Sequence, residues 1–120
     1  MAETFLSVRV DLGPRSYEIR IRSGGSAAAG EFFNPVRQWR RALLIADRAV
    51  AQLYAPQVAK SLAASGATVD TLVVEPGEPS KCVAQAELLW NKLLELGADR
   101  KTLVVAVGGG VIGDLAGFVA

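Results

Sequence analysis

The chain has 120 residues, of which 51% are hydrophobic and 21% are charged, and its formal net charge is +1. This size and composition are those of one globular domain with a single core, and they exclude a largely disordered chain. With no histidine and a single cysteine, the chain itself can supply no Ser-His-Asp triad, internal disulfide or imidazole zinc site.

The first predicted element is a β-hairpin. Residues 5–12 and 17–22 both alternate between apolar and polar side chains, and the Gly-Pro-Arg-Ser sequence of residues 13–16 is typical of a turn. We expect two antiparallel strands with one face on the core and the other in water. Residues 23–34, rich in Gly, Ala and Ser, are expected to form a loop or short helix whose two phenylalanines pack on the core.

Three short apolar segments then follow at regular intervals. Residues 42–46, 71–74 and 103–107 are continuously apolar rather than alternating, which is typical of parallel strands buried on both faces. Helical patterns separate them. The order strand–helix–strand–helix–strand–helix predicts an α/β fold, a Rossmann-like parallel sheet with right-handed crossovers.

Three helices are expected around this sheet. The first has Pro56 in the first turn of its main segment and ends at Gly66, and the second is capped by Ser80 and ends at Gly97. The third covers residues 111–120 and shows no stop signal. The side chains expected to face the core are Val58, Leu62 and Ala63 in the first helix and Ala86, Leu89, Trp90, Leu93 and Leu96 in the second.

A glycine-rich segment joins the third buried strand to the last helix. Gly108, Gly110 and Gly113 fit the pattern G-x-G-x-x-G of a dinucleotide fingerprint. A turn without side chains lets a pyrophosphate approach the backbone, and the free N–H groups of the next helix favour its charge. The alternative is a tight strand-to-helix turn. In the usual dinucleotide fold the glycines follow the first strand, whereas these follow the third.

Polar residues follow the other two buried strands. Asp47 ends the first of them, where ligands sit in open α/β sheets, and is either a ribose-binding acid or the N-cap of the next helix. Residues 75–81 offer carboxylates for hydroxyl groups and a lysine for phosphate, or form a plain acidic loop. Asp114 is expected to stabilise the helix start through the dipole, to contact a ribose or to orient the nicotinamide. Since a carboxylate repels a pyrophosphate, its side chain must point away from the phosphates. Cys82 is expected to be a small, at least half-buried residue.

The remaining signals concern partners. The cluster Arg37, Arg40 and Arg41 lacks aromatic neighbours and is expected to be a solvated surface, so no nucleic acid is predicted. No apolar run reaches the ~18 residues that span a bilayer, and no secretory signal is visible. We therefore expect no membrane partner and a cytoplasmic location.

Several segments together resemble one family. GGGVIGDLAGFVA after the strand LVVAV, with LLELGADRKT, EPGEPSK, ADRAVAQLY and SYEIRI before it, resembles the 3-dehydroquinate synthases of the sugar-phosphate cyclase family. Glycerol dehydrogenase-like and iron-dependent alcohol dehydrogenase-like enzymes share the architecture but place a lysine or serine soon after their glycines. Other cyclases, such as 2-epi-5-epi-valiolone and 2-deoxy-scyllo-inosose synthases, share this half of the chain. A non-catalytic NAD-binding module is a further alternative.

The resemblance implies a lyase of the shikimate pathway, which makes aromatic amino acid precursors. The complete enzyme would convert the sugar acid phosphate DAHP to 3-dehydroquinate with elimination of phosphate. Tightly bound NAD would oxidise a hydroxyl transiently and return the hydride, and a divalent metal, zinc or cobalt, would bind the substrate. A homodimer is also implied.

The family resemblance assigns roles only to residues that would bind the nucleotide. Asp47 matches the family's adenosine-ribose acid, Glu78 and Lys81 match its second NAD loop, and residues 110–114 match its pyrophosphate loop. The cofactor-binding residues so predicted are Asp47, Pro76, Gly77, Glu78, Pro79, Ser80, Lys81, Gly108, Gly109, Gly110, Val111, Ile112, Gly113 and Asp114.

No catalytic residue and no metal ligand can be assigned in this chain. The family's ligands, a glutamate and two histidines, lie in a C-terminal helical domain that has no counterpart in these 120 residues. We therefore expect residues 1–120 to be an incomplete N-terminal nucleotide-binding domain that ends within a helix. Leu115, Phe118 and Val119 would then lack part of their packing, and the isolated chain would be inactive.

Overall fold

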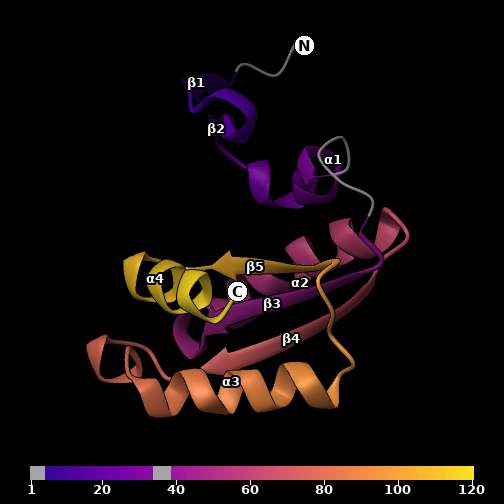
Figure 1. The fold of residues 1–120 in the computed structure, drawn as a ribbon. Helices are drawn as coiled ribbons and strands as arrows, with labels where there is room; N and C mark the ends of the chain where they lie inside the picture. Colours follow the sequence, from indigo (N-terminus) through magenta and orange to yellow (C-terminus); the bar gives the residue numbers. More distant parts are fainter. Residues whose placement is uncertain (1–4, 34–38) are drawn as a thin grey trace.

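The computed structural model describes residues 5–33 and 39–120 (Figure 1). Its first element is the predicted hairpin, in which β1 (Leu6–Val10) pairs antiparallel with β2 (Tyr17–Ile21). A 3₁₀ turn at Gly13–Arg15 joins the two strands, as the Gly-Pro sequence predicts.

The apolar face of this hairpin is not buried, and the prediction of one dry face is wrong. Leu6, Val8, Ile19 and Ile21 are between 42% and 61% exposed. The hairpin stands apart from the three-stranded sheet (Figure 1), and its apolar face receives no cover from it. The guanidinium of Arg20 in β2 does lie over the Phe32 ring of α1, 5.1 Å from its centroid. Alternation therefore identified the strands correctly, but it could not say whether anything covers them.

A 3₁₀ turn (Gly25–Ala28) and the short helix α1 (Ala29–Phe33) follow, and both pack on α2 (Arg48–Ala64). The amide of Gly30 donates to Ser61 Oγ at 2.9 Å, and Gln57 Nε2 donates to Ser26 Oγ at 2.6 Å. Phe33 packs against the core on this side. The expected short helix is thus confirmed, while Asn34 and Arg37 lie outside the described residues.

The predicted parallel sheet has three strands. They are β3 (Arg41–Asp47), β4 (Thr68–Val74) and β5 (Thr102–Val107), in the order β4-β3-β5. Because β3 has a neighbour on each edge and helices on each face, its residues 42–46 are no more than 1% exposed. This burial explains why the segment contains only apolar residues. The same prediction is wrong for β4 and β5, which lie at the edges of this sheet: Val73 is 48% exposed, and only Val105 of β5 is buried.

Helices cover both faces of the sheet (Figure 1). On one face, Leu44 of β3 packs with Val58 and Leu62 of α2. On the other face, Ile45 packs with residues of α3 (Val83–Glu95) and α4 (Gly110–Val119). The α/β fold predicted from the sequence is confirmed.

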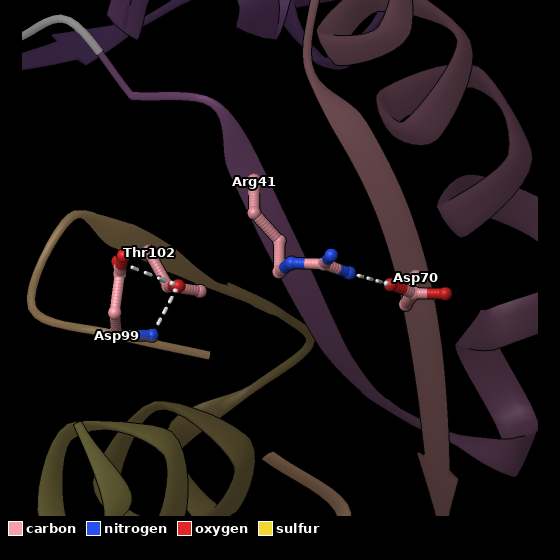
Figure 2. Close-up of polar contacts among 4 residues, drawn as sticks. All are labelled: Arg41, Asp70, Asp99 and Thr102. Atoms are coloured by element: carbon pink, nitrogen blue, oxygen red, sulfur yellow. Dashed lines mark hydrogen bonds and ion pairs between the residues drawn. The ribbon is translucent and has the colours of Figure 1, made fainter. Parts of the chain in front are cut away.

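Polar contacts hold the amino ends of the strands (Figure 2). Arg41 Nη1 lies 3.1 Å from Asp70 Oδ2, which ties β3 to β4. The Asp99 amide donates to Thr102 Oγ1 at 2.9 Å and shapes the turn that leads into β5. These contacts fix the sheet at the end opposite the glycine-rich segment.

Two helix starts differ from the predictions. Pro56 lies inside α2, which runs unbroken from Arg48 to Ala64, so the carbonyl of Gln52 has no N–H partner at Pro56. Ser80 does not cap α3, which begins at Val83 after Cys82. Both errors follow from assigning a start signal to the nearest helix without knowing the tertiary position.

The helix ends were predicted better than the buried faces. Gly66 and Gly97 both follow helices with positive φ of +96° and +75°, which favours glycine. Ala63 and Trp90, however, are exposed, because the buried stripes of α2 and α3 are narrower than predicted. Trp90 instead donates from Nε1 to the carbonyl of Val119 at 3.0 Å.

Residues of α4 also differ from expectation. Leu115 and Val119 are buried in the core, with 3% and 6% exposure, so the expectation that they lack packing is wrong. Only Phe118 fits that expectation, at 63% exposure.

Replacement of Gly30 by alanine should destabilise the fold. A Cβ at this position would lie 2.6 Å from Ser65 Oγ and closer still to the Ser61 carbonyl oxygen. We expect the free energy of unfolding to fall by about 1–3 kcal/mol in urea denaturation. Gly117→Ala is the matched control, since its Cβ would meet nothing within 4 Å. An equal loss in both variants would contradict the proposed packing of α1 on α2.

Candidate functional site

Three loops come together at the carboxyl edge of the sheet. Asp47 ends β3, Glu75 follows β4, and Gly108 follows β5. The chain leaves β3 towards β4 on one side and then returns to β5 on the other. The strand order therefore reverses between β3 and β5, and ligands of open α/β sheets bind at such a reversal.

In the glycine-rich segment, the fold itself requires glycine at only one of the four positions. Gly108 has φ +157°, and a Cβ there would lie 3.0 Å from Ile112, so packing and conformation both favour glycine. Gly109, Gly110 and Gly113 have no positive φ, and a Cβ on any of them would meet no described atom within 4 Å. Neither packing nor backbone geometry among the described residues explains these three glycines, whereas close approach of a ligand would.

The start of α4 presents unpaired backbone donors. Gly109 is its N-cap and offers no side chain, and the first helical bond runs from Gly113 N to Gly109 O at 3.0 Å. The N–H groups of Gly110, Val111 and Ile112 therefore have no partner within the helix. Together with the positive end of the helix dipole, these donors suit an anion. The Ile112 side chain is 1% exposed and anchors the turn.

The loop after β4 is held in place by its own contacts. Gly77 has φ +100°, and residues Glu78–Ser80 form a single 3₁₀ turn with Pro79 in it. Ser80, 8% exposed, donates from Oγ to the carbonyl of Glu75 at 2.6 Å. The serine therefore braces this loop instead of capping α3. The loop leaves the carboxylate of Glu78 exposed to solvent.

Lys81 joins this loop to α4. Its Nζ lies 2.8 Å from Asp114 Oδ2 and 4.0 Å from Glu78 Oε2. The hydrogen bond and charge of Asp114, followed by the charge of Glu78, raise the pKa of Lys81 above its ordinary value. Sequence reasoning assigned each of these residues to the nucleotide but missed the ion pair, because nothing local in the sequence signals it.

Asp47 caps α2, which is one of the two roles that the sequence left open. Its Oδ1 accepts a hydrogen bond from the Val50 amide at 3.0 Å, which confirms the N-cap interpretation. Its Oδ2 has no hydrogen-bond partner among the described residues, and the side chain is half-buried. The ribose role stays a prediction.

Arg48 and Glu75 form a second contact that sequence reasoning missed. Arg48 Nε donates to Glu75 Oε1 at 2.9 Å, and Nη2 contacts the same oxygen. The hydrogen bond from Arg48 lowers the pKa of Glu75, and the same bond raises the pKa of Arg48. The pair joins the ends of β3 and β4 beside Asp47.

The described residues offer no metal centre. No group of three or more His, Cys, Asp or Glu side chains lies close enough together, over residues 5–33 and 39–120, to hold an ion. The expectation that Cys82 is at least half-buried is wrong, since it is an exposed free thiol at the N-cap of α3. No helix in the described part of the chain is long and apolar enough to cross a membrane.

Comparisons with known proteins agree on one family. The family model for the N-terminal part of 3-dehydroquinate synthase matches residues 71–120. A 3-dehydroquinate synthase from Rhodopirellula baltica is 42% identical, over 100% of this chain and 34% of its own length. A 2-epi-valiolone synthase from Stigmatella aurantiaca is 46% identical, over 87% of this chain and 26% of its own length.

Solved structures of related cyclases share the fold. A 2-deoxy-scyllo-inosose synthase superposes with a TM-score of 0.84 at 24% identity, covering 96% of this chain and 32% of that one. A 2-epi-5-epi-valiolone synthase from Streptomyces hygroscopicus subsp. jinggangensis, with NAD+ and Zn2+ bound, gives a TM-score of 0.60 at 29% identity. That match covers 68% of this chain and 23% of the synthase.

The predicted resemblance to the 3-dehydroquinate synthases is thereby confirmed. The chain spans about a third of the length of the curated synthases it matches. Those proteins therefore contain a larger part that has no counterpart in these residues.

Loss of the Asp114 carboxylate should lower the pKa of Lys81. Asp114→Asn removes the charge of Asp114 and leaves Lys81 at most a weaker, neutral hydrogen-bond acceptor, whereas Glu78→Gln removes only the smaller effect of the Glu78 charge. The pair stabilises the fold below the ordinary lysine pKa, and this contribution is lost as the pH rises through the raised pKa. NMR titration of the Lys81 side chain tests this. An unchanged pKa in Asp114→Asn would show that the pair is absent in solution.

Proposed function

We propose that this chain is the NAD-binding N-terminal part of a 3-dehydroquinate synthase. The observation that carries the proposal is the open glycine turn at the start of α4, which lies at the reversal of strand order. Identity of 40–45% to several 3-dehydroquinate synthases supports the same conclusion.

Each loop has a distinct role in holding the nucleotide. The amides of Gly110, Val111 and Ile112 would bind the pyrophosphate, because they have no partner within the helix and lie at its positive end. The free Oδ2 of Asp47 would accept a hydrogen bond from the adenosine ribose. The loop from Pro76 to Lys81 would cover the nucleotide, with Glu78 available to its hydroxyl groups.

The Lys81–Asp114 ion pair would keep this site ordered. Because Lys81 Nζ lies 2.8 Å from Asp114 Oδ2, its positive charge would offset that of the carboxylate close to the pyrophosphate. The ion pair also connects the loop after β4 to α4, which are the two sides of the proposed site. Lys81 would then act partly as a bridge and partly as a positive charge near the phosphates.

NAD, when bound, would supply a transient hydride acceptor for a substrate hydroxyl, and the protein residues would orient it. The whole protein would convert DAHP to 3-dehydroquinate with loss of phosphate. Its metal cannot be held by the described residues, and the sequence has no histidine. We therefore propose that these 120 residues alone give no turnover; phosphate released from DAHP by the purified chain would contradict this.

A second candidate is a cyclase that makes a different carbocycle. The 46% identity to a 2-epi-valiolone synthase favours it as a specific alternative. The product of the complete coding sequence should be assayed with DAHP and with sedoheptulose 7-phosphate. Conversion of DAHP supports the first candidate, and conversion of sedoheptulose 7-phosphate alone supports the second.

The family resemblance also favours a homodimer in the cytoplasm. Light scattering on the complete gene product would give its mass, and a monomer at micromolar concentration would contradict the dimer.

Replacement of Gly110 by valine should abolish NAD binding without unfolding the chain. The side chain has room within the fold, since a Cβ at Gly110 meets nothing within 4 Å. It would instead occupy the surface that the pyrophosphate approaches, and we expect affinity to fall about 100-fold or more in calorimetric titration.

Gly117→Val is the matched control for this experiment. It introduces the same side chain into the same helix, at a position with equal space and away from the turn. NAD affinity should then match that of the wild type. Equal affinity in both variants would mean that the glycine turn does not contact the nucleotide.

A further inference from the structure

Arg48 lies beside the carboxylates of Asp47 and Glu75, at the end of the site where the ribose is proposed to bind. Arg48 follows Asp47 directly and is the first residue of α2. Its guanidinium donates from Nε to Glu75 Oε1 at 2.9 Å, with Nη2 on the same oxygen. The two side chains remain 67% and 65% exposed, so solvent and ligands can reach both.

The sheet fixes the positions of these two residues. Asp47 of β3 lies opposite Val74 of β4 in the parallel register, so the residues that follow each strand are neighbours. The Ser80 hydroxyl holds the carbonyl of Glu75 at 2.6 Å and limits movement of its backbone. Glu75 is therefore placed beside Arg48 by strand pairing and by the braced loop, and not by side-chain attraction alone.

The chemistry of this position concerns the 2′ substituent of the adenosine ribose. A carboxylate such as that of Asp47 accepts a hydrogen bond from a 2′-hydroxyl and repels a 2′-phosphate. A guanidinium has the opposite preference, because its planar donors match phosphate oxygens. A free Arg48 beside Asp47 would therefore weaken the discrimination between NAD and NADP.

We propose that Glu75 is a specificity-determining residue that favours NAD over NADP by holding Arg48 away from the 2′ position of the ribose. This inference rests on the proposed NAD site. Glu75 binds the guanidinium and also adds a second negative charge at this edge. Exposed ion pairs contribute little to the stability of a fold. Specificity requires only that the pair lowers the affinity for one ligand more than the affinity for the other.

The test compares NAD and NADP affinity in the complete gene product carrying Glu75→Gln. We expect NADP to bind about tenfold more tightly than to the wild type, and NAD affinity to change by less than about twofold. The gain should shrink at high salt because it depends on an exposed charge. The exposed position of Glu75 favours normal folding, which circular dichroism would check.

The double variant Arg48→Ala with Glu75→Gln separates two explanations of such a gain. If Arg48 is the group that Glu75 restrains, the gain in NADP affinity disappears in the double variant. If the gain persists there, Glu75 acts only through its charge, and the proposed role of Arg48 is wrong. Arg48→Ala alone should leave NADP binding as weak as in the wild type.

The remaining outcomes distinguish this inference from its premise. Wild-type protein that binds NAD, with no gain of NADP affinity in Glu75→Gln, overturns the inference and leaves the proposed function intact. Wild-type protein that binds neither nucleotide overturns both.

Discussion

The pairing of β3 with strands on both of its edges is the constraint on which the rest of the structure depends. Residues 42–46 are buried on every side, which requires apolar side chains, and both neighbouring strands run parallel to them. Parallel pairing in turn places the carboxyl ends of all three strands at one edge. The proposed nucleotide site is a consequence of this arrangement, because its three loops are adjacent only when the sheet is formed.

Much of the fold was predictable because burial on two faces leaves a clear signature in sequence. The apolar run of β3 is buried in this way, and the glycines after α2 and α3 mark where those helices end. The apolar run of β5 also predicted a strand, although only Val105 in it is buried. The positions of Pro56 and Ser80 were predicted wrongly, since both residue types favour helix starts in general and only tertiary packing decides where they lie. The exposure of the β1–β2 hairpin could not be predicted from the sequence either, because alternation of apolar and polar residues does not show what covers the apolar face.

The site shows the same division between local and long-range information. The glycine turn is a local signal, and the structure adds that Gly109, Gly110 and Gly113 face open space. The ion pairs Lys81–Asp114 and Arg48–Glu75 join residues from different loops, and no periodicity or motif predicts them. Because Lys81 and Arg48 are bound to carboxylates, the amides at the start of α4 are the donors best placed for an anion. The Arg48–Glu75 pair also sets the charge around the proposed ribose position.

The central claim is that the start of α4 binds the pyrophosphate of NAD, and NMR titration of the amides tests it at the level of single residues. Addition of NAD should shift the amide resonances of Gly110, Val111 and Ile112 more than those at the amino ends of the strands, such as Asp99 and Thr102. Shifts confined to other parts of the chain, or none at saturating NAD, would contradict the claim.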